Sequence, residues 1–166
     1  MLLEDQKMVD VAQENLPAFI NPTINVLEEM TGVKSIPSDV MMDKSMLPSS
    51  EIAVVIGISG ELQGAFVISA EKEVAYEMAS KLMGGVDTSG LCCYEIAEAI
   101  AEFANIVAGN SMILMERTSI NINISPPTIV IGQGEKLRIG GSSEMVITIL
   151  NSDIGEVAIS LVLMKV

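Results

Sequence analysis

Residues 95–115 read EIAEAIAEFANIVAGNSMILM and predict the long helix around which the rest of the chain is expected to pack. Most of these positions are apolar or small, so we expect the helix to be buried on most sides. One polar stripe interrupts the pattern, because a period of 3.6 residues places Glu98, Glu102, Asn105 and Gly109 on one narrow face. A buried carboxylate or amide costs free energy unless it has a partner. The stripe is therefore expected to face an opening.

The residue types of the stripe admit two interpretations. In the first, Glu102 supplies a charged acceptor, Asn105 supplies one acceptor and two donors, and Gly109 lets another surface come close. In the second, the stripe is simply the solvated side of the helix. Glu98 and Glu102 are like charges four residues apart, which slightly destabilises an isolated helix. That cost slightly favours the functional interpretation but does not decide between the two.

The N-terminal third of the chain begins with helical sequence. Residues 3–31 carry this signal, but Pro17 and Pro22 interrupt it, so we expect two helices or one kinked helix. Gly32 is expected to end this region as a helix C-cap. Residues 33–50 contain prolines and several serines and are expected to be irregular.

A hairpin and a helix are predicted next. Residues 51–59 and 63–69 are rich in β-branched residues and flank a turn at Gly60 and Glu61. Residues 71–83 follow as a helix, and the glycine pair 84–85 is expected to stop it.

Strands are predicted after the long helix. Residues 119–125 alternate apolar and polar side chains, which is typical of a half-exposed strand. The proline pair 126–127 breaks this strand, residues 128–131 continue extended, and residues 144–151 and 156–166 form a closing hairpin. The order α-β-β-α-α-β-β-β predicts one α+β domain over residues 1–166, with a mostly antiparallel sheet and helices packed on one face.

The composition excludes several kinds of chemistry. The chain has no histidine, so Ser-His or Cys-His nucleophile pairs and the usual histidine-bearing zinc centres are impossible. Cys92 and Cys93 are adjacent, which suits neither a disulfide framework nor a zinc site, and we interpret them as structural residues near a helix start. Asp and Glu are scattered, without a tight cluster suited to a hard cation, so no bound metal is expected.

Charge and hydropathy restrict the partners and the cellular location that are expected. A formal net charge of −13 disfavours nucleic acids and anionic membranes, whose phosphates would repel the chain. No uncharged apolar run approaches the ~18 residues that a membrane-spanning helix needs. Residues 1–5 lack the features of a signal peptide, so a cytoplasmic location is expected.

Motifs on both sides of the stripe are typical of one protein family. They are VIGISG at 55–60, Gly64, LMGG at 82–85, EFANIVAGN at 102–110 and ISPPT at 124–128. E-x-x-N alone carries little information, but E-x-x-N before Ala-Gly, with Pro-Pro-Thr about twenty residues on, is fairly specific. Over residues 54–131 the chain resembles the CheX branch of the CheC/CheX/FliY family of chemotaxis phosphatases.

This resemblance implies an activity and residue roles. Members bind the phosphorylated receiver domain CheY and hasten loss of its aspartyl phosphate. Glu102 would contact the receiver near its active-site lysine, and Asn105 would enter the receiver's active site and orient the attacking water. Glu98 and Gly109 would support them. The receiver would hold the Mg²⁺ ion, so this chain needs no cofactor.

Two features bear on the branch and on the activity. CheC-type members carry a second E-x-x-N in the first helix, whereas this chain has Pro17 where that Asn would stand. One site fits the CheX branch, whose members form homodimers through sheet edges, and we expect the strand at 120–124 or the closing hairpin to supply that edge.

The family usually has Asp or Ser where this chain has Glu98. An alternative is therefore a non-catalytic module that binds a receiver or another signalling protein, and a third is an interaction protein outside chemotaxis.

Overall fold

The computed structural model describes residues 2–43, 47, 48, 50–134, 136, 138 and 143–164. Within these residues lie four helices and eight strands. The helices are α1 (Leu2–Asn15), α2 (Pro17–Thr31), α3 (Lys72–Leu82) and α4 (Cys93–Arg117). The strands are β1 (Ile36–Pro37), β2 (Met41–Asp43), β3 (Ile52–Gly60), β4 (Gly64–Ala70), β5 (Ile122–Ile124), β6 (Thr128–Ile131), β7 (Ser143–Ser152) and β8 (Gly155–Met164).

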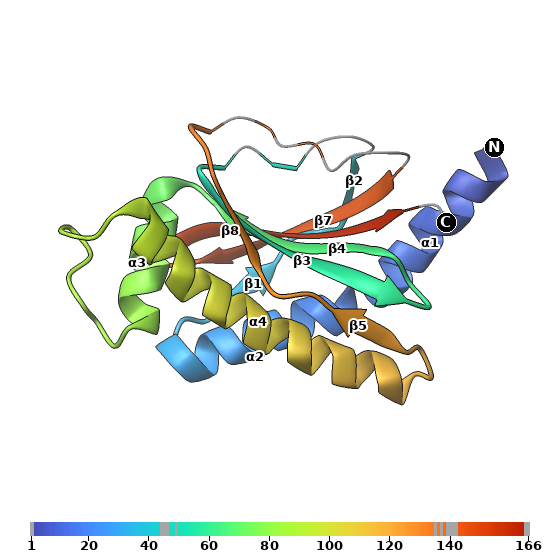
Figure 1. The fold of residues 1–166 in the computed structure, drawn as a ribbon, viewed down its shortest axis with the longest axis horizontal. Coiled ribbons are helices and arrows are strands. Elements are labelled where there is room, and N and C mark those ends of the chain that lie inside the picture. The colour runs from blue at the N-terminus through green and yellow to red at the C-terminus, as the bar shows by residue number, and fades with distance from the viewer. Residues whose placement is uncertain are drawn as a thin grey trace.

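The strands form one antiparallel sheet (Figure 1). Its order is β1-β7-β8-β4-β3-β5, with β2 paired to β7 beside β1 and β6 paired to β3 beside β5. The two predicted hairpins are present, since β3 pairs with β4 and β7 pairs with β8. They join in the middle of the sheet through β4 and β8, where Gly64 lies opposite Leu163.

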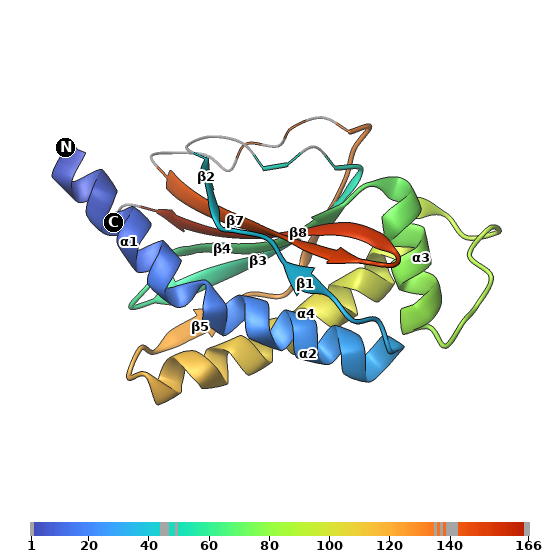
Figure 2. The ribbon, with the colours of Figure 1, turned by 180° about the vertical axis from the view of Figure 1, so that it is seen from behind.

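All four helices pack on one face of this sheet. Figures 1 and 2 show α2 and α4 side by side along that face, with α3 near one end of α4 and α1 extending past the other end of the sheet. The shared core includes Ala12, Phe19, Ala75 and Phe103 from the helices. The ring of Phe19 lies 5.2 Å from that of Phe66 on β4, centroid to centroid. The predicted α+β fold with an antiparallel sheet and helices on one face is confirmed.

The opposite face of the sheet is apolar as well. A second buried cluster contains Leu47, Ala53, Val67, Met145 and Val162. All seven residues of β4 are buried, which explains why the sequence GAFVISA does not alternate between apolar and polar positions.

The boundaries of the N-terminal helices agree with the positions of proline and glycine in the sequence. Pro17 occupies the first turn of α2, where a missing N–H is harmless, and Pro22 is accommodated within that helix. Gly32 ends α2 with φ 75°, and its N–H donates to the Glu28 carbonyl at 2.8 Å. The C-cap predicted at Gly32 is confirmed.

The prediction of irregular structure across residues 33–50 is wrong in part, because β1 and β2 lie there and pair with β7. Ser38 fixes this segment: its carbonyl accepts from Thr148 Oγ1 at 2.8 Å and its Oγ accepts from the Ile149 N–H at 3.0 Å. The closing hairpin is consequently not a free sheet edge, contrary to expectation, since β1 and β2 occupy the outer side of β7. The strand expected at 120–124 does lie at the other edge, as β5.

Candidate functional site

The helix that carries the polar stripe, α4, begins with a capping box. The N–H of Cys92, the N-cap residue, donates to Glu95 Oε2 at 2.8 Å. This hydrogen bond holds the pKa of the Glu95 carboxyl below its ordinary value of 4.5. Glu95 is therefore a capping residue. The sequence analysis did not assign this role, although a Glu at the third helical position is the available signal.

The buried side of α4 determines which side chains face outward. Ile96, Ile100, Phe103 and Val107 are all buried at a helical spacing. They anchor this side of α4 in the shared core. The other side of the helix is left exposed, and it carries the stripe.

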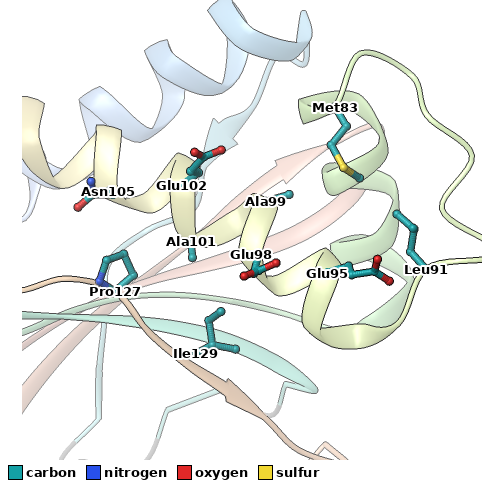
Figure 3. Close-up of a pocket in the computed structure, with 10 residues that line it drawn as sticks. All are labelled: Met83, Leu91, Glu95, Glu98, Ala99, Ala101, Glu102, Asn105, Pro127 and Ile129. Atoms are coloured by element: carbon teal, nitrogen blue, oxygen red, sulfur yellow. The ribbon is translucent and has the colours of Figure 1, made fainter.

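A cleft of about 700 Å³ runs along this exposed side (Figure 3). Three segments contribute to its walls. One wall is α4 itself, and β6 and the residue before it supply Ile129 and Pro127 on the facing side. Met83, just after α3, and Leu91, just before α4, close one end. Carboxylate, amide and apolar groups therefore line the same opening.

Three of the four predicted site residues line this cleft. Glu98, Glu102 and Asn105 are exposed on α4 and belong to its lining. Gly109 lies one turn beyond Asn105, is partly exposed and is not part of the lining. A Cβ built on Gly109 meets no atom of the described residues within 4 Å, so their packing does not demand glycine there.

The polar atoms of the stripe are available to a partner. Within the described part of the chain, the side chains of Glu98, Glu102 and Asn105 make no hydrogen bond or ion pair. Figure 3 shows the carboxylates of Glu98 and Glu102 pointing in different directions from the helix. Two carboxylates and one amide thus face solvent at the cleft and are not used in hydrogen bonds to other described residues.

A bend between β5 and β6 positions the wall opposite α4. Gly57 on β3 and Ser125 in the bend are joined twice: the Gly57 N–H donates to Ser125 Oγ at 2.8 Å, and the Ser125 N–H donates to the Gly57 carbonyl at 2.9 Å. A Cβ on Gly57 would lie 3.1 Å from Ser125 Oγ, which is tighter than most Cβ contacts in proteins. Two of the motifs noted in the sequence therefore meet here and set Pro127 beside the cleft.

The adjacent cysteines lie at the start of α4, as the sequence analysis interpreted them. Both are free thiols, and Cys93 Sγ lies 3.4 Å from the hydroxyl of Tyr76. This hydrogen bond is the main reason that the pKa of Tyr76 rises to about 12. Across the described residues, no three His, Cys, Asp or Glu side chains gather in a way that could hold a metal ion.

Comparison with known proteins identifies the family. Residues 52–150 match the family model described as chemotaxis phosphatase CheX. The chain is 32% identical over 113 residues to the CheY-P phosphatase CheX of Thermotoga maritima, and the match covers 68% of each chain.

Solved structures show the same fold. The chemotaxis protein CheX from Desulfovibrio desulfuricans superposes with a TM-score of 0.82 at 20% identity, covering 90% of this chain and 99% of that one. A chain of the CheX-CheY-BeF3-Mg²⁺ complex from Borrelia burgdorferi gives a TM-score of 0.68 at 25% identity, covering 90% and 97%. With more than half of its length matching the family model, the chain belongs to the CheX family of chemotaxis phosphatases.

Proposed function

We propose that the protein accelerates hydrolysis of the aspartyl phosphate on a CheY-type receiver domain. The observation that carries the proposal is the exposed pair Glu102 and Asn105 on the cleft side of α4, whose side chains bond to no other described residue. Two relatives support it: the Thermotoga maritima protein is a CheY-P phosphatase, and the Borrelia burgdorferi CheX was crystallised with CheY, BeF3 and Mg²⁺.

Asn105 is the residue proposed to act on the attacking water. Its carboxamide combines a hydrogen-bond acceptor with two donors, so it can hold a water in line with the phosphorus and also contact the phosphoryl group. The receiver supplies the acyl phosphate and the Mg²⁺ ion, so this chain needs no cofactor of its own. Ordering one water in this way is worth about 100-fold or more in rate.

Glu102 is proposed to dock the receiver. Its carboxylate lies one helical turn before Asn105 and is exposed. A lysine near the receiver's phosphorylation site is a suitable partner, because a carboxylate and an ammonium form a charge-assisted hydrogen bond. Glu102 would thereby hold the receiver in the register in which Asn105 reaches the phosphate.

A second candidate function is favoured by Glu98. This carboxylate lines the same cleft as Glu95 and Glu102 and adds negative charge where a phosphorylated receiver would approach. A protein that binds the receiver but leaves its phosphate in place would have the same fold and the same exposed stripe. The two functions differ in whether the receiver's phosphate lifetime changes.

The test is the lifetime of the aspartyl phosphate on each CheY-type receiver encoded in the same genome, measured with Mg²⁺. Wild-type protein should shorten the lifetime of at least one receiver, and Asn105→Ala should not. Asn25→Ala is the matched control, since Asn25 is also an exposed helical asparagine but lies on α2 and outside the cleft lining. Binding without any shortening would establish the non-catalytic module, and an active Asn105→Ala variant would refute the assigned role.

We also propose that the protein forms a homodimer through a sheet edge and acts in the cytoplasm. In the described structure the outer strands available for pairing are β1 and β2 on one side and β5 and β6 on the other. None of the described helices is long and apolar enough to cross a membrane. Sedimentation equilibrium tests the dimer, because one chain has a mass of 17.6 kDa.

A further inference from the structure

Helix α4 continues for three turns beyond Asn105 and exposes apolar side chains there. Ile106 and Ile113 are 45% and 49% exposed, which is high for isoleucine. They are seven residues apart and so lie on the same side of the helix, next to the polar stripe. Gly109 lies between them. We call Ile106, Gly109 and Ile113 the apolar ridge.

The apolar ridge differs from the rest of the exposed side of α4 in charge. The first half of α4 carries Glu95, Glu98 and Glu102, whereas no charged residue occurs between Glu102 and Glu116. This stretch exposes the uncharged side chains of Asn105, Ile106, Asn110 and Ile113 in a chain with a net charge of −13. It suits contact with an apolar surface better than contact with solvent alone.

Packing among the described residues does not explain the glycine at position 109. A Cβ at this position meets nothing within 4 Å, and φ at Gly109 is not among the positive values of the described glycines. Glycine in the middle of a helix lowers its stability relative to alanine. The missing side chain does, however, leave a low point between two isoleucines, where another surface can approach the backbone.

The position of the apolar ridge fits a partner centred on Asn105. At 1.5 Å per residue, Ile113 lies about 12 Å along the helix from Asn105. A specific protein interface covers about 800 Å² on each partner, which corresponds to a radius of about 16 Å if it is circular. A receiver whose phosphate is reached by Asn105 would therefore also cover the apolar ridge.

We propose that the apolar ridge is a docking surface for the receiver, and that an apolar part of the receiver next to its phosphorylation site packs on Ile106 and Ile113. This inference rests on the proposed function and assigns receiver binding and phosphate loss to different parts of α4. The apolar ridge sets how tightly the receiver binds, and Asn105 sets how fast the bound phosphate is lost.

The test is the dependence of the dephosphorylation rate on receiver concentration, which separates KM from kcat. The variant is Ile106→Ser combined with Ile113→Ser, and Gly109→Gln fills the low point without removing an apolar group. Met30→Ser is the matched control, because Met30 is 42% exposed on α2, away from the cleft lining and from the outer strands of the sheet. Thermal unfolding and sedimentation check that each variant keeps the fold and the mass of wild type.

The double variant and Gly109→Gln should each raise KM roughly tenfold or more while kcat stays within about twofold of wild type. Met30→Ser should leave both parameters unchanged. If the double variant keeps the wild-type KM while Asn105→Ala remains inactive, the docking surface is refuted and the phosphatase function stands. If wild type neither binds nor dephosphorylates any of the receivers, both proposals are refuted together.

Discussion

Gly57 and Ser125 exchange two hydrogen bonds across 68 positions of sequence, one from the Gly57 N–H to Ser125 Oγ at 2.8 Å and one from the Ser125 N–H to the Gly57 carbonyl at 2.9 Å. Ser125 precedes two prolines, neither of which has an N–H to donate to the sheet. The serine hydroxyl and backbone therefore tie this bend to β3 just before Pro127 reaches the cleft.

Ser125→Ala should destabilise the protein by about 1 kcal/mol, because it removes the hydrogen bonds of the Ser125 hydroxyl with the Gly57 N–H and the Pro126 carbonyl and leaves the Gly57 N–H without that partner. Urea unfolding followed by circular dichroism measures the change. Ser59→Ala is the control. Ser59 is exposed on β3, the strand that holds Gly57, and its side chain makes no hydrogen bond among the described residues. Equal stability of the two variants would show that the Ser125 hydroxyl does not hold the bend.

Glu102→Gln should weaken receiver binding while preserving the fold, because it removes the charge and keeps the shape of an exposed side chain. The expected change in Kd is about tenfold, as for other charge-assisted contacts at interfaces. Titration with receiver carrying beryllofluoride and Mg²⁺ measures it. Glu14→Gln, an exposed carboxylate on α1, should bind as wild type does, and an unchanged affinity of Glu102→Gln would remove its docking role.

Glu98→Ser should lower KM for the phosphorylated receiver, because it removes a carboxylate that repels both Glu102 and the incoming phosphate. Repulsion between exposed charges is screened by salt, with a Debye length of about 8 Å at physiological ionic strength. The advantage of the variant should therefore shrink as salt increases. A KM above that of wild type would instead mean that Glu98 supports the active geometry.

Glu95→Ala should destabilise the N-terminal turn of α4, and the effect should depend on pH. The Cys92 N–H lowers the pKa of Glu95 in the folded state from 4.5, so the carboxylate stabilises the fold above pH 4.5 and loses this contribution as the pH falls through the lowered value. The difference in stability between wild type and Glu95→Ala should be largest near neutral pH and shrink in acid. Denaturant unfolding at a series of pH values from 3 to 7 checks this, and a constant difference would contradict it.

The helices could be predicted because their signals are local. Pro17, Gly32 and the glycine pair after α3 mark helix boundaries through the backbone conformations that they permit, and the stripe on α4 follows from its period alone. The strands β1 and β2 could not be predicted, because they exist through pairing with β7, more than a hundred residues later, and Ile36–Pro37 has no pattern of its own. The role of Glu95 was missed because its cap partner is a cysteine, which is not a usual N-cap residue.

The meeting of β4 with β8 has a consequence for folding kinetics. Each hairpin closes a short loop, but the pairing of Gly64 with Leu163 must close a loop that contains α3, α4, β5 and β6. Closing long loops is entropically costly and slows folding. The hairpins are thus expected to form early and to join late, and only that late step completes the core in which Phe103 of α4 lies together with Phe66 of β4 and Leu161 of β8. During refolding, recovery of activity should follow the slowest phase rather than the early gain of secondary structure.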